Sequence, residues 1–272
     1  MALDNFIPTV WSETLYEELQ NNYVGVKLSS REYEGEIKNH GDRVKITGLN
    51  PVTVFDYKKN TDMPLPQQLD STTTTLTIDQ AKGFNFYIDD IDNIQSSPKL
   101  LRAAMKKAAD ALSDEADRYI YSLTDGRIET VHEPNLSKDN ILDIISGMRR
   151  SLLYNNVPNT AKLSLEISPC VEQMLIMANV LTATNNSEVL SKGYVGSVLG
   201  FDVYVSNNLY FGEAGTRCVA RTKRAISFAE QICSIKTYEP ERRNGTAVKG
   251  LHLYGAKIVY PGEIIFLDST QA

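Results

Sequence analysis

The sequence has little of the side-chain chemistry on which most enzymes depend. Only three histidines and three cysteines occur among its 272 residues. None of the histidines (His40, His132 and His252) has the HExxH spacing of a zinc protease, so a structural role is expected for each. No GxSxG nucleophile motif is present. These absences argue against the common hydrolase classes.

Three segments come closest to known ligand-binding motifs, and each departs from its motif. The glycines of 193–200 lack the GxGxxG spacing, and segment 250–257 has Ala256 where a phosphate-binding loop needs lysine. The acidic run 88–92 lacks the spacing and the glycine of an EF-hand loop. We therefore expect no catalytic residue, no cofactor and no metal site, and hence a protein that is not an enzyme.

Other absences bear on partners and compartment. Acidic residues outnumber basic ones by 34 to 28, for a net charge of -6, which argues against charge-driven binding to DNA or anionic membranes. No apolar run approaches the roughly 18 residues of a membrane span, and no secretory signal is recognisable at the N-terminus. The cysteines (Cys170, Cys218 and Cys233) are odd in number and widely spaced, so reduced, buried thiols are expected.

The segment from Ser97 to Gly126 has the strongest periodic pattern and predicts one long helix. Ser97 can cap it, Pro98 suits its first position, and Asp125-Gly126 supplies a left-handed stop. Its apolar stripe consists of Leu101, Ala104, Met105, Ala108, Leu112, Ala116, Tyr119, Ile120 and Leu123. At about 1.5 Å per residue the helix would span roughly 40 Å and form the spine of the protein.

The charges of this helix oppose its dipole. Lys99, Arg102, Lys106 and Lys107 lie in the N-terminal half, and Asp110, Asp114, Glu115 and Asp117 lie in the C-terminal half. The pairs Lys106–Asp110 and Asp114–Arg118 recover only about a few tenths of a kcal/mol each. The other charges either form a solvated face or have partners elsewhere, on adjacent subunits.

Residues 1–32 are interpreted as an arm. They contain the only tryptophan, Trp11, and a short helix capped at Ser12, but too few apolar positions to fold alone. Such an arm either packs back on its own body, which we favour, or reaches onto a partner.

Residues 33–92 change to a two-residue period. Alternation around 44–46, 52–54 and 76–78 predicts strands with one solvent-facing side. Segment 58–70 contains two prolines and little apolar surface, so it is expected to form an exposed tip between long strands. Because isolated two-stranded ribbons are marginally stable, this ribbon needs a neighbour to pack against.

The region after the spine helix has a mixed pattern. Ser137 is expected to cap a helix with inward apolar residues between 141 and 152, and 162–167 alternates as a strand. Ser168-Pro169 opens another helix, and 193–209 predicts a turn followed by an alternating strand.

The C-terminal part predicts a second ribbon. Two strand-like runs, 224–239 and 247–260, flank the polar tip 240–246, and 262–267 adds a last strand. The spine helix is the natural platform for this ribbon. The chain is thus expected to have an α+β fold.

Several segments together resemble the major capsid proteins of tailed double-stranded DNA bacteriophages. They are GDRVKITGL (41–49), FNFYIDDIDNIQ (84–95), GSVLGFDVYVSNNL (196–209) and the run 225–267. The order of arm, long hairpin, spine helix, mixed domain and second ribbon is similar to the Hong Kong 97-type capsid fold. This resemblance implies an N-terminal arm (1–32), an E-loop (33–92), a P-domain (93–135 and 224–261) and an A-domain (136–223 and 262–272).

The resemblance also implies where subunits touch. The E-loop tip would lie over a neighbouring subunit, the turn near 194 would face a capsomer axis, and the tip of the second ribbon would approach a local threefold axis. The contact residues expected on this basis are Trp11, Lys58, Lys59, Tyr194, Glu239, Glu241, Arg242 and Arg243.

One branch of the resembled family forms a covalent crosslink between subunits. It joins an E-loop lysine to an asparagine on a P-domain strand, with a nearby glutamate as catalyst. Lys58, Lys59 and Glu241 are available here, but 232–238 contains no asparagine. No crosslink is therefore expected.

The function implied by the resemblance is that of a major capsid protein. Copies of the chain would form hexamers and pentamers, and these an icosahedral virion shell around double-stranded DNA, assembled in the host bacterial cytoplasm. The implied partners are a separate scaffolding protein, a portal and decoration proteins, with DNA held without sequence-specific binding and no membrane. The net negative charge suits an inner wall that does not adhere to DNA. The alternatives are an encapsulin-like bacterial nanocompartment shell protein and an unrecognised hydrolase.

Overall fold

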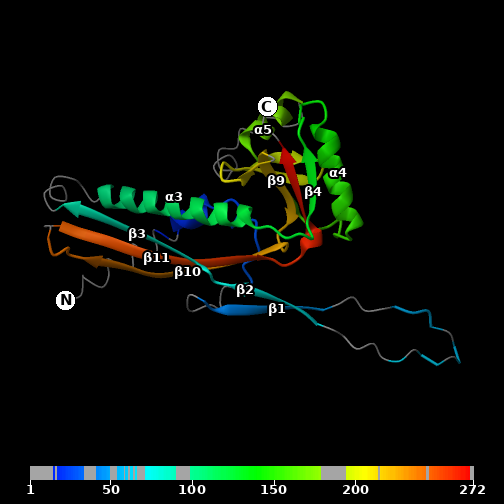
Figure 1. Cartoon of the computed structure of the whole chain (residues 1–272), viewed down its shortest axis with the longest axis horizontal. Coiled ribbons are helices and arrows are strands. Elements are labelled where there is room, and N and C mark those ends of the chain that lie inside the picture. Colours follow the sequence, from blue (N-terminus) through cyan, green and yellow to red (C-terminus); the bar gives the residue numbers. More distant parts are fainter. Residues whose placement is uncertain are drawn as a thin grey trace.

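The structure is a computed structural model of the chain. It describes residues 15, 17–33, 41–49, 54–57, 59–60, 62–63, 65, 71–89, 99–178, 194–213, 215–242 and 245–269. Figure 1 shows a long helix lying along a narrow sheet, an α/β body at one end of that sheet, and a hairpin that projects away from both.

The spine helix, α3, spans Lys99–Ser122. Its predicted stripe faces the core, with Met105, Leu112, Ala116 and Ile120 all buried. The helix ends earlier than the left-handed stop predicted at Gly126. The N–H of Leu123 bonds to the carbonyl of Ile120, which tightens the last turn, and the Asp125 carboxylate accepts the N–H of Arg127. The expected cap at Ser97 lies outside the described residues.

A three-stranded antiparallel sheet lies against α3 (Figure 1). Its strands, in spatial order, are β10 (Ile226–Tyr238), β11 (Gly245–Ile258) and β3 (Gln80–Asp89). β10 and β11 form the predicted second ribbon, so its expected packing on the spine helix is confirmed. β3 falls within the range 33–92 but pairs with β11 along its full length.

The first hairpin consists of β1 (Arg43–Leu49) and β2 (Ser71–Thr77), which pair in antiparallel register. Val44, Ile46, Leu76 and Ile78 pack on Ala229 and Leu253 of the three-stranded sheet. The hairpin lies on the side of that sheet away from α3 (Figure 1). Only the base of the hairpin is covered in this way. The first hairpin therefore packs against a neighbour, as an isolated two-stranded ribbon must do to be stable.

Of the strand predicted around 52–54, residues 52 and 53 lie outside the described residues, and the described residues 54–57 have no strand structure. Extending the β1–β2 register would set Val54 opposite Pro66 and Asp56 opposite Pro64. Proline has no N–H to donate, so pairing cannot continue at these positions even though Val54 itself favours a strand.

The α/β body is built on a seven-stranded mixed sheet. Its path runs through β4 (Glu129–Glu133), β12 (Ile264–Ser269), β9 (Gly215–Thr222), β5 (Leu163–Ile167), β7 (Phe201–Val205) and β6 (Tyr194–Val198), and β8 (Phe211–Gly212) pairs with β9. The helices of the body are α4 (Ile141–Tyr154) and α5 (Pro169–Met177), and a 3-10 turn, η2 (Pro261–Glu263), precedes β12.

Two helix starts were predicted in this body, and one of them is confirmed. Ser168 caps α5, since its hydroxyl accepts the N–H of Val171 and Pro169 occupies the first position. The prediction for Ser137 is wrong, because Asn140 holds the N-cap position of α4. Ser137 instead donates its N–H to the side chain of Asn140 and opens the preceding turn.

One further prediction is wrong. Strand β5 does not alternate between core and solvent, since all five of its residues are buried between β9 and β7. His132 lies in β4.

The cysteines were expected to be reduced, buried thiols. Cys218 is free and buried, and burial raises its pKa to about 12. Cys170 is free but only partly buried. The side chain of Cys233 lies outside the described residues.

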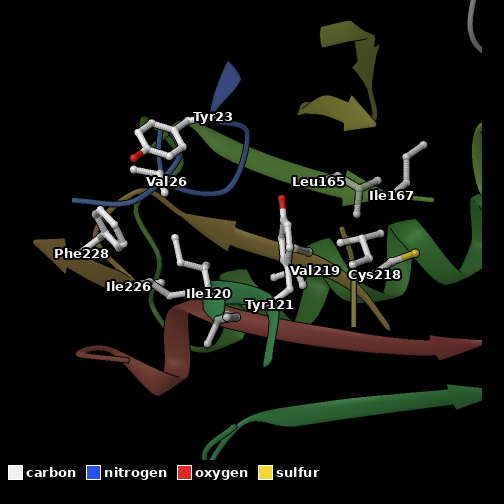
Figure 2. Close-up of a cluster of buried hydrophobic side chains, with 14 of the residues drawn as sticks. Tyr23, Val26, Ile120, Tyr121, Leu165, Ile167, Cys218, Val219, Ile226 and Phe228 are labelled. Atoms are coloured by element: carbon white, nitrogen blue, oxygen red, sulfur yellow. The ribbon is translucent and has the colours of Figure 1, made fainter. Parts of the chain in front are cut away.

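The N-terminal segment, residues 17–33, packs back on its own chain, as favoured from sequence. Figure 2 shows Tyr23 and Val26 beside Phe228 and Ile226 at the start of β10, in the same cluster as Ile120 of α3. The backbone of Ser30 also bonds to Ile226 and Phe228. This segment therefore joins the spine helix, the three-stranded sheet and the α/β body into one core.

Candidate assembly surfaces

The described residues contain no group of three or more metal-ligating side chains, and no described helix is long and apolar enough to cross a membrane. A cavity of about 330 Å³ is lined by Tyr210, Glu213, Arg217 and Asp268, among others. The Arg217 guanidinium is already bound to both oxygens of Asp268, at 2.8 and 3.2 Å.

The projecting end of the first hairpin is an apolar surface without cover from its own chain. Val54 is 91% exposed and Leu65 is 92% exposed, and Phe55, Tyr57 and Met63 are exposed as well. Lys59 lies among them and is also exposed, while Lys58 lies outside the described residues. Several large apolar side chains exposed on one projecting segment are typical of surfaces that contact another molecule.

The tip of the second ribbon is charged. Glu239, Glu241 and Arg242 are all exposed, and Arg243 lies outside the described residues. Charges of both signs therefore lie within four positions on this exposed tip.

The remaining expected contact residues lie elsewhere. Tyr194 is the first residue of β6, the last strand along the described sheet path, and the structure does not describe its side chain. Trp11 lies outside the described residues. Figure 1 places the projecting hairpin and the second-ribbon tip at opposite ends of the molecule, so the structure does not bring these residues into one site.

A buried polar centre that the sequence did not predict anchors the N-terminal segment to the sheet. The Glu230 carboxylate accepts hydrogen bonds from Tyr23 (2.5 Å), Gln20 (3.2 Å) and Arg31, and Nε2 of His252 lies 2.9 Å from it. Burial alone would raise the pKa of Glu230, but the contacts and charges of His252 and Arg31 outweigh it and lower the pKa. Glu230 is therefore held as a carboxylate.

A second buried centre connects the N-terminal segment to the α/β body. The guanidinium of Arg221 pairs with both oxygens of Glu166, at 2.7 and 3.2 Å, and both side chains are fully buried. The same guanidinium donates to the carbonyls of Gly25 and Leu28 and to the hydroxyl of Ser29. Every donor of Arg221 thus finds an acceptor, as a buried cation requires.

Asp117 of α3 lies beside this centre. Its carboxylate accepts the backbone N–H groups of Val24 and Val26, at 2.9 and 3.0 Å. Burial raises the pKa of Asp117 to about 7, although the two backbone hydrogen bonds oppose that shift. Asp117 was expected to be part of a charged helix face, and its burial corrects that expectation.

Three other charged residues of the spine helix also find partners within the chain. Lys106 pairs with Glu18 at 3.4 Å, and Glu115 pairs with Lys82 at 2.9 Å and with Arg118 at 3.6 Å. The predicted pairs Lys106–Asp110 and Asp114–Arg118 are replaced by these contacts. Adjacent subunits were expected to supply partners for the charges of the arm and of the spine helix. That expectation is wrong for these paired residues, because the chain folds its own N-terminal segment onto α3.

Comparison with protein-family models and with curated proteins gives no match. Solved structures do match. A structure from Mycobacterium phage Che8 is 26% identical, has a TM-score of 0.72, and the match covers 90% of this chain and 91% of that chain. The capsid of Ralstonia phage GP4 is 12% identical, with a TM-score of 0.67 and coverage of 93% and 91%. A virus-like particle from Pyrococcus furiosus is 12% identical, with a TM-score of 0.61 and coverage of 98% and 100%.

These matches cover 90% or more of the chain. The chain therefore shares a fold of mixed helix and sheet with these structures. Its fold is the Hong Kong 97-type capsid fold of phage heads, as the resemblance implied.

Proposed function

We propose that the chain is a major capsid protein of a tailed bacteriophage. Copies of it associate into hexamers and pentamers, and these form the icosahedral head that encloses double-stranded DNA. The observation that carries the proposal is the uncovered apolar end of the first hairpin on a chain with the phage capsid fold. A self-assembling subunit needs such surfaces, which remain incomplete until another copy covers them.

The parts of the subunit follow the family pattern in this proposal. Residues 1–32 act as the N-terminal arm, 33–92 as the E-loop, 93–135 with 224–261 as the P-domain, and 136–223 with 262–272 as the A-domain. The pairing of β3 with β11 supports a continuous connection from the E-loop into the P-domain sheet. The E-loop base is thereby anchored while its end remains available to a neighbour.

The proposed contact residues divide among several interfaces. Lys58 and Lys59 contact the neighbour beneath the E-loop tip, and Tyr194 contacts its counterpart around a capsomer axis. Glu239, Glu241, Arg242 and Arg243 pair between copies at a local threefold axis, and Trp11 contacts an adjacent subunit. Each contact can be weak by itself, because a closed shell makes many at once.

Other partners act on the assembled shell. A separate scaffolding protein guides assembly in the host cytoplasm, a portal occupies one vertex, and decoration proteins bind outside. DNA is held without sequence-specific contacts, in keeping with the net charge of -6. A steep salt-dependent affinity of the unassembled chain for DNA would contradict this part of the proposal. The chain has no catalytic role, and its shells should separate into monomers on boiling in detergent because no covalent crosslink forms.

The experiment that tests the proposal is negative-stain microscopy of the expressed full chain, alone and with a candidate scaffolding protein. Closed shells of uniform diameter support a capsid. Small discrete oligomers under every condition contradict it.

The likeness to the Pyrococcus virus-like particle supports a second candidate, an encapsulin-like compartment shell. The contents of shells purified from the native source separate the two candidates. Packaged double-stranded DNA supports the capsid, and a packaged enzyme supports the compartment.

A further inference from the structure

The turn between β6 and β7 has an unusual residue at its first position. Val198 pairs with Phe201, so Leu199 and Gly200 alone make the connection. Both have positive φ angles, 49° for Leu199 and 82° for Gly200. Two positive φ angles define the type I′ turn that favours two-residue hairpins, and asparagine or glycine is preferred at its first position. Leucine in this conformation is strained.

Leu199 differs from the other described residues that have a positive φ angle and are not glycine. The only other described residues with positive φ that are not glycine are Asn60 and Asn156, at 64° and 61°. Asparagine adopts this conformation at low cost. Among the described residues, Leu199 is therefore the one bulky apolar side chain held in a left-handed conformation.

Packing within the subunit does not account for leucine at this position. The side chain of Leu199 is 43% exposed, and its neighbours Ser197 and Gly200 are exposed too. A leucine that leaves this much of its surface in water gains less from burial than a core leucine, so burial within the subunit offsets only part of the cost of the strained backbone.

One side chain connects the turn to α4. Arg149 donates a hydrogen bond from its guanidinium to the carbonyl of Leu199. The same guanidinium lies against Gly200 so closely that a Cβ at this position would overlap it. A backbone contact of this kind reduces the entropy that is lost when the exposed side chain is covered by a partner.

The place of the turn in the fold indicates what covers it. β6 is the last strand of the described sheet path, so the turn lies at the margin of the α/β body, where another body can approach. The fold is that of proteins that assemble with copies of themselves into capsids. We propose that Leu199 is a contact residue between copies of this chain, and that the strained turn of the free subunit is stabilised when a second copy covers the leucine. This inference rests on the proposed function.

The test uses three variants of the full chain. Leu199→Asn removes both the strain and the apolar side chain, Leu199→Met keeps both, and Asn156→Leu introduces the same conformational cost at an exposed turn elsewhere. Two quantities are measured for each variant: the Tm of the unassembled chain, and the concentration at which half of the chains sediment as shells.

Leu199→Asn is expected to stabilise the unassembled chain and to weaken its assembly. Leu199→Asn should raise the Tm by about 2 °C, and Asn156→Leu should lower it by a similar amount. Leu199→Asn should also raise the half-assembly concentration about fivefold to tenfold, while Leu199→Met should resemble the wild type in both measurements.

Two results would overturn the inference while leaving the proposed function intact. One is a Leu199→Asn chain that assembles at the wild-type concentration, since its leucine would then contact no other copy. The other is a Leu199→Asn chain with a lower Tm, since the turn would then not be strained. Failure of the wild-type chain itself to form shells would instead contradict the proposed function.

Discussion

The guanidinium of Arg221 and the carboxylate of Glu166 form an ion pair from which solvent is completely excluded, with Nε 2.7 Å from Oε1. Their strands, β9 and β5, are neighbours in the seven-stranded sheet. The same guanidinium donates hydrogen bonds to three acceptors of the N-terminal segment. One buried side chain thus joins the α/β body to residues about 190 positions earlier in the sequence.

Replacing Arg221 with Met should destabilise the chain strongly. The substitution leaves Glu166 buried and uncompensated, and three acceptors in the N-terminal segment lose their donor. Loss of one partner of a buried ion pair typically costs about 3–5 kcal/mol. Urea denaturation of the unassembled chain measures this change. Arg118→Met, which removes the solvent-exposed partner of Glu115, is the control and should change the free energy of unfolding far less.

Asp117 should make stability depend on pH in a defined direction. Its pKa is about 7 in the folded chain and 3.8 as the reference value, so the folded state binds the proton more tightly. The stabilisation from this proton is full below pH 4 and is lost as the pH rises to 7, by at most about 1.4 kcal/mol per pH unit. Relative to Asp117→Asn, the wild type should therefore lose stability between pH 4 and pH 7 and change little above pH 7.

Denaturation of the wild type and of Asp117→Asn at pH 5 and pH 8 measures this effect. The difference in the free energy of unfolding between the two chains should shift against the wild type at the higher pH. A difference that is the same at both values would show that the Asp117 carboxyl has an ordinary pKa.

Gly255 should not tolerate a side chain. A Cβ at this position of β11 would lie 2.2 Å from the carbonyl oxygen of Thr77, where the first hairpin crosses the sheet. Gly255→Ala should therefore displace the hairpin and cost about 1–3 kcal/mol, because backbone and not a flexible side chain blocks the space. Gly147→Ala in α4 is the control, since nothing lies within 4 Å of its Cβ. The control should be stabilising by about 0.5–1 kcal/mol.

The apolar residues of the hairpin end should matter for assembly and not for folding. Val54→Ser with Leu65→Ser should leave the Tm of the unassembled chain unchanged, because both side chains are already exposed. The yield of shells should fall severalfold, because covering this surface is part of what stabilises the assembly. Equal shell yields from the double variant and the wild type would exclude a contact at these residues.

Much of the fold could be predicted from local patterns. The spine helix, the β10–β11 ribbon, helix α5 and strand β12 all follow from periodicity and capping, because each has an apolar stripe and clear end signals. The strand expected around 52–54 does not extend to Val54, whose partner in the β1–β2 register would be Pro66, more than ten positions away in the chain. The resemblance to capsid proteins rested on the order of elements, and the comparisons confirm it.

The buried polar centres could not be predicted. Glu230 lies 207 positions from Tyr23, and Arg221 lies 196 positions from Gly25, so no local pattern relates them. One signal was present. Glu230 shares the phase of Ile226 and Phe228 along β10, and a carboxylate in phase with core residues indicates a buried partner.

The central claim is that the end of the first hairpin is covered by another copy of the chain. A photo-crosslinking amino acid at position 54 tests it, in shells assembled from equal amounts of light-isotope and heavy-isotope chains. Mass spectrometry should find crosslinked peptides that join light and heavy chains in assembled shells and none in unassembled chain. Crosslinks confined to single chains in the assembled shells would contradict the claim.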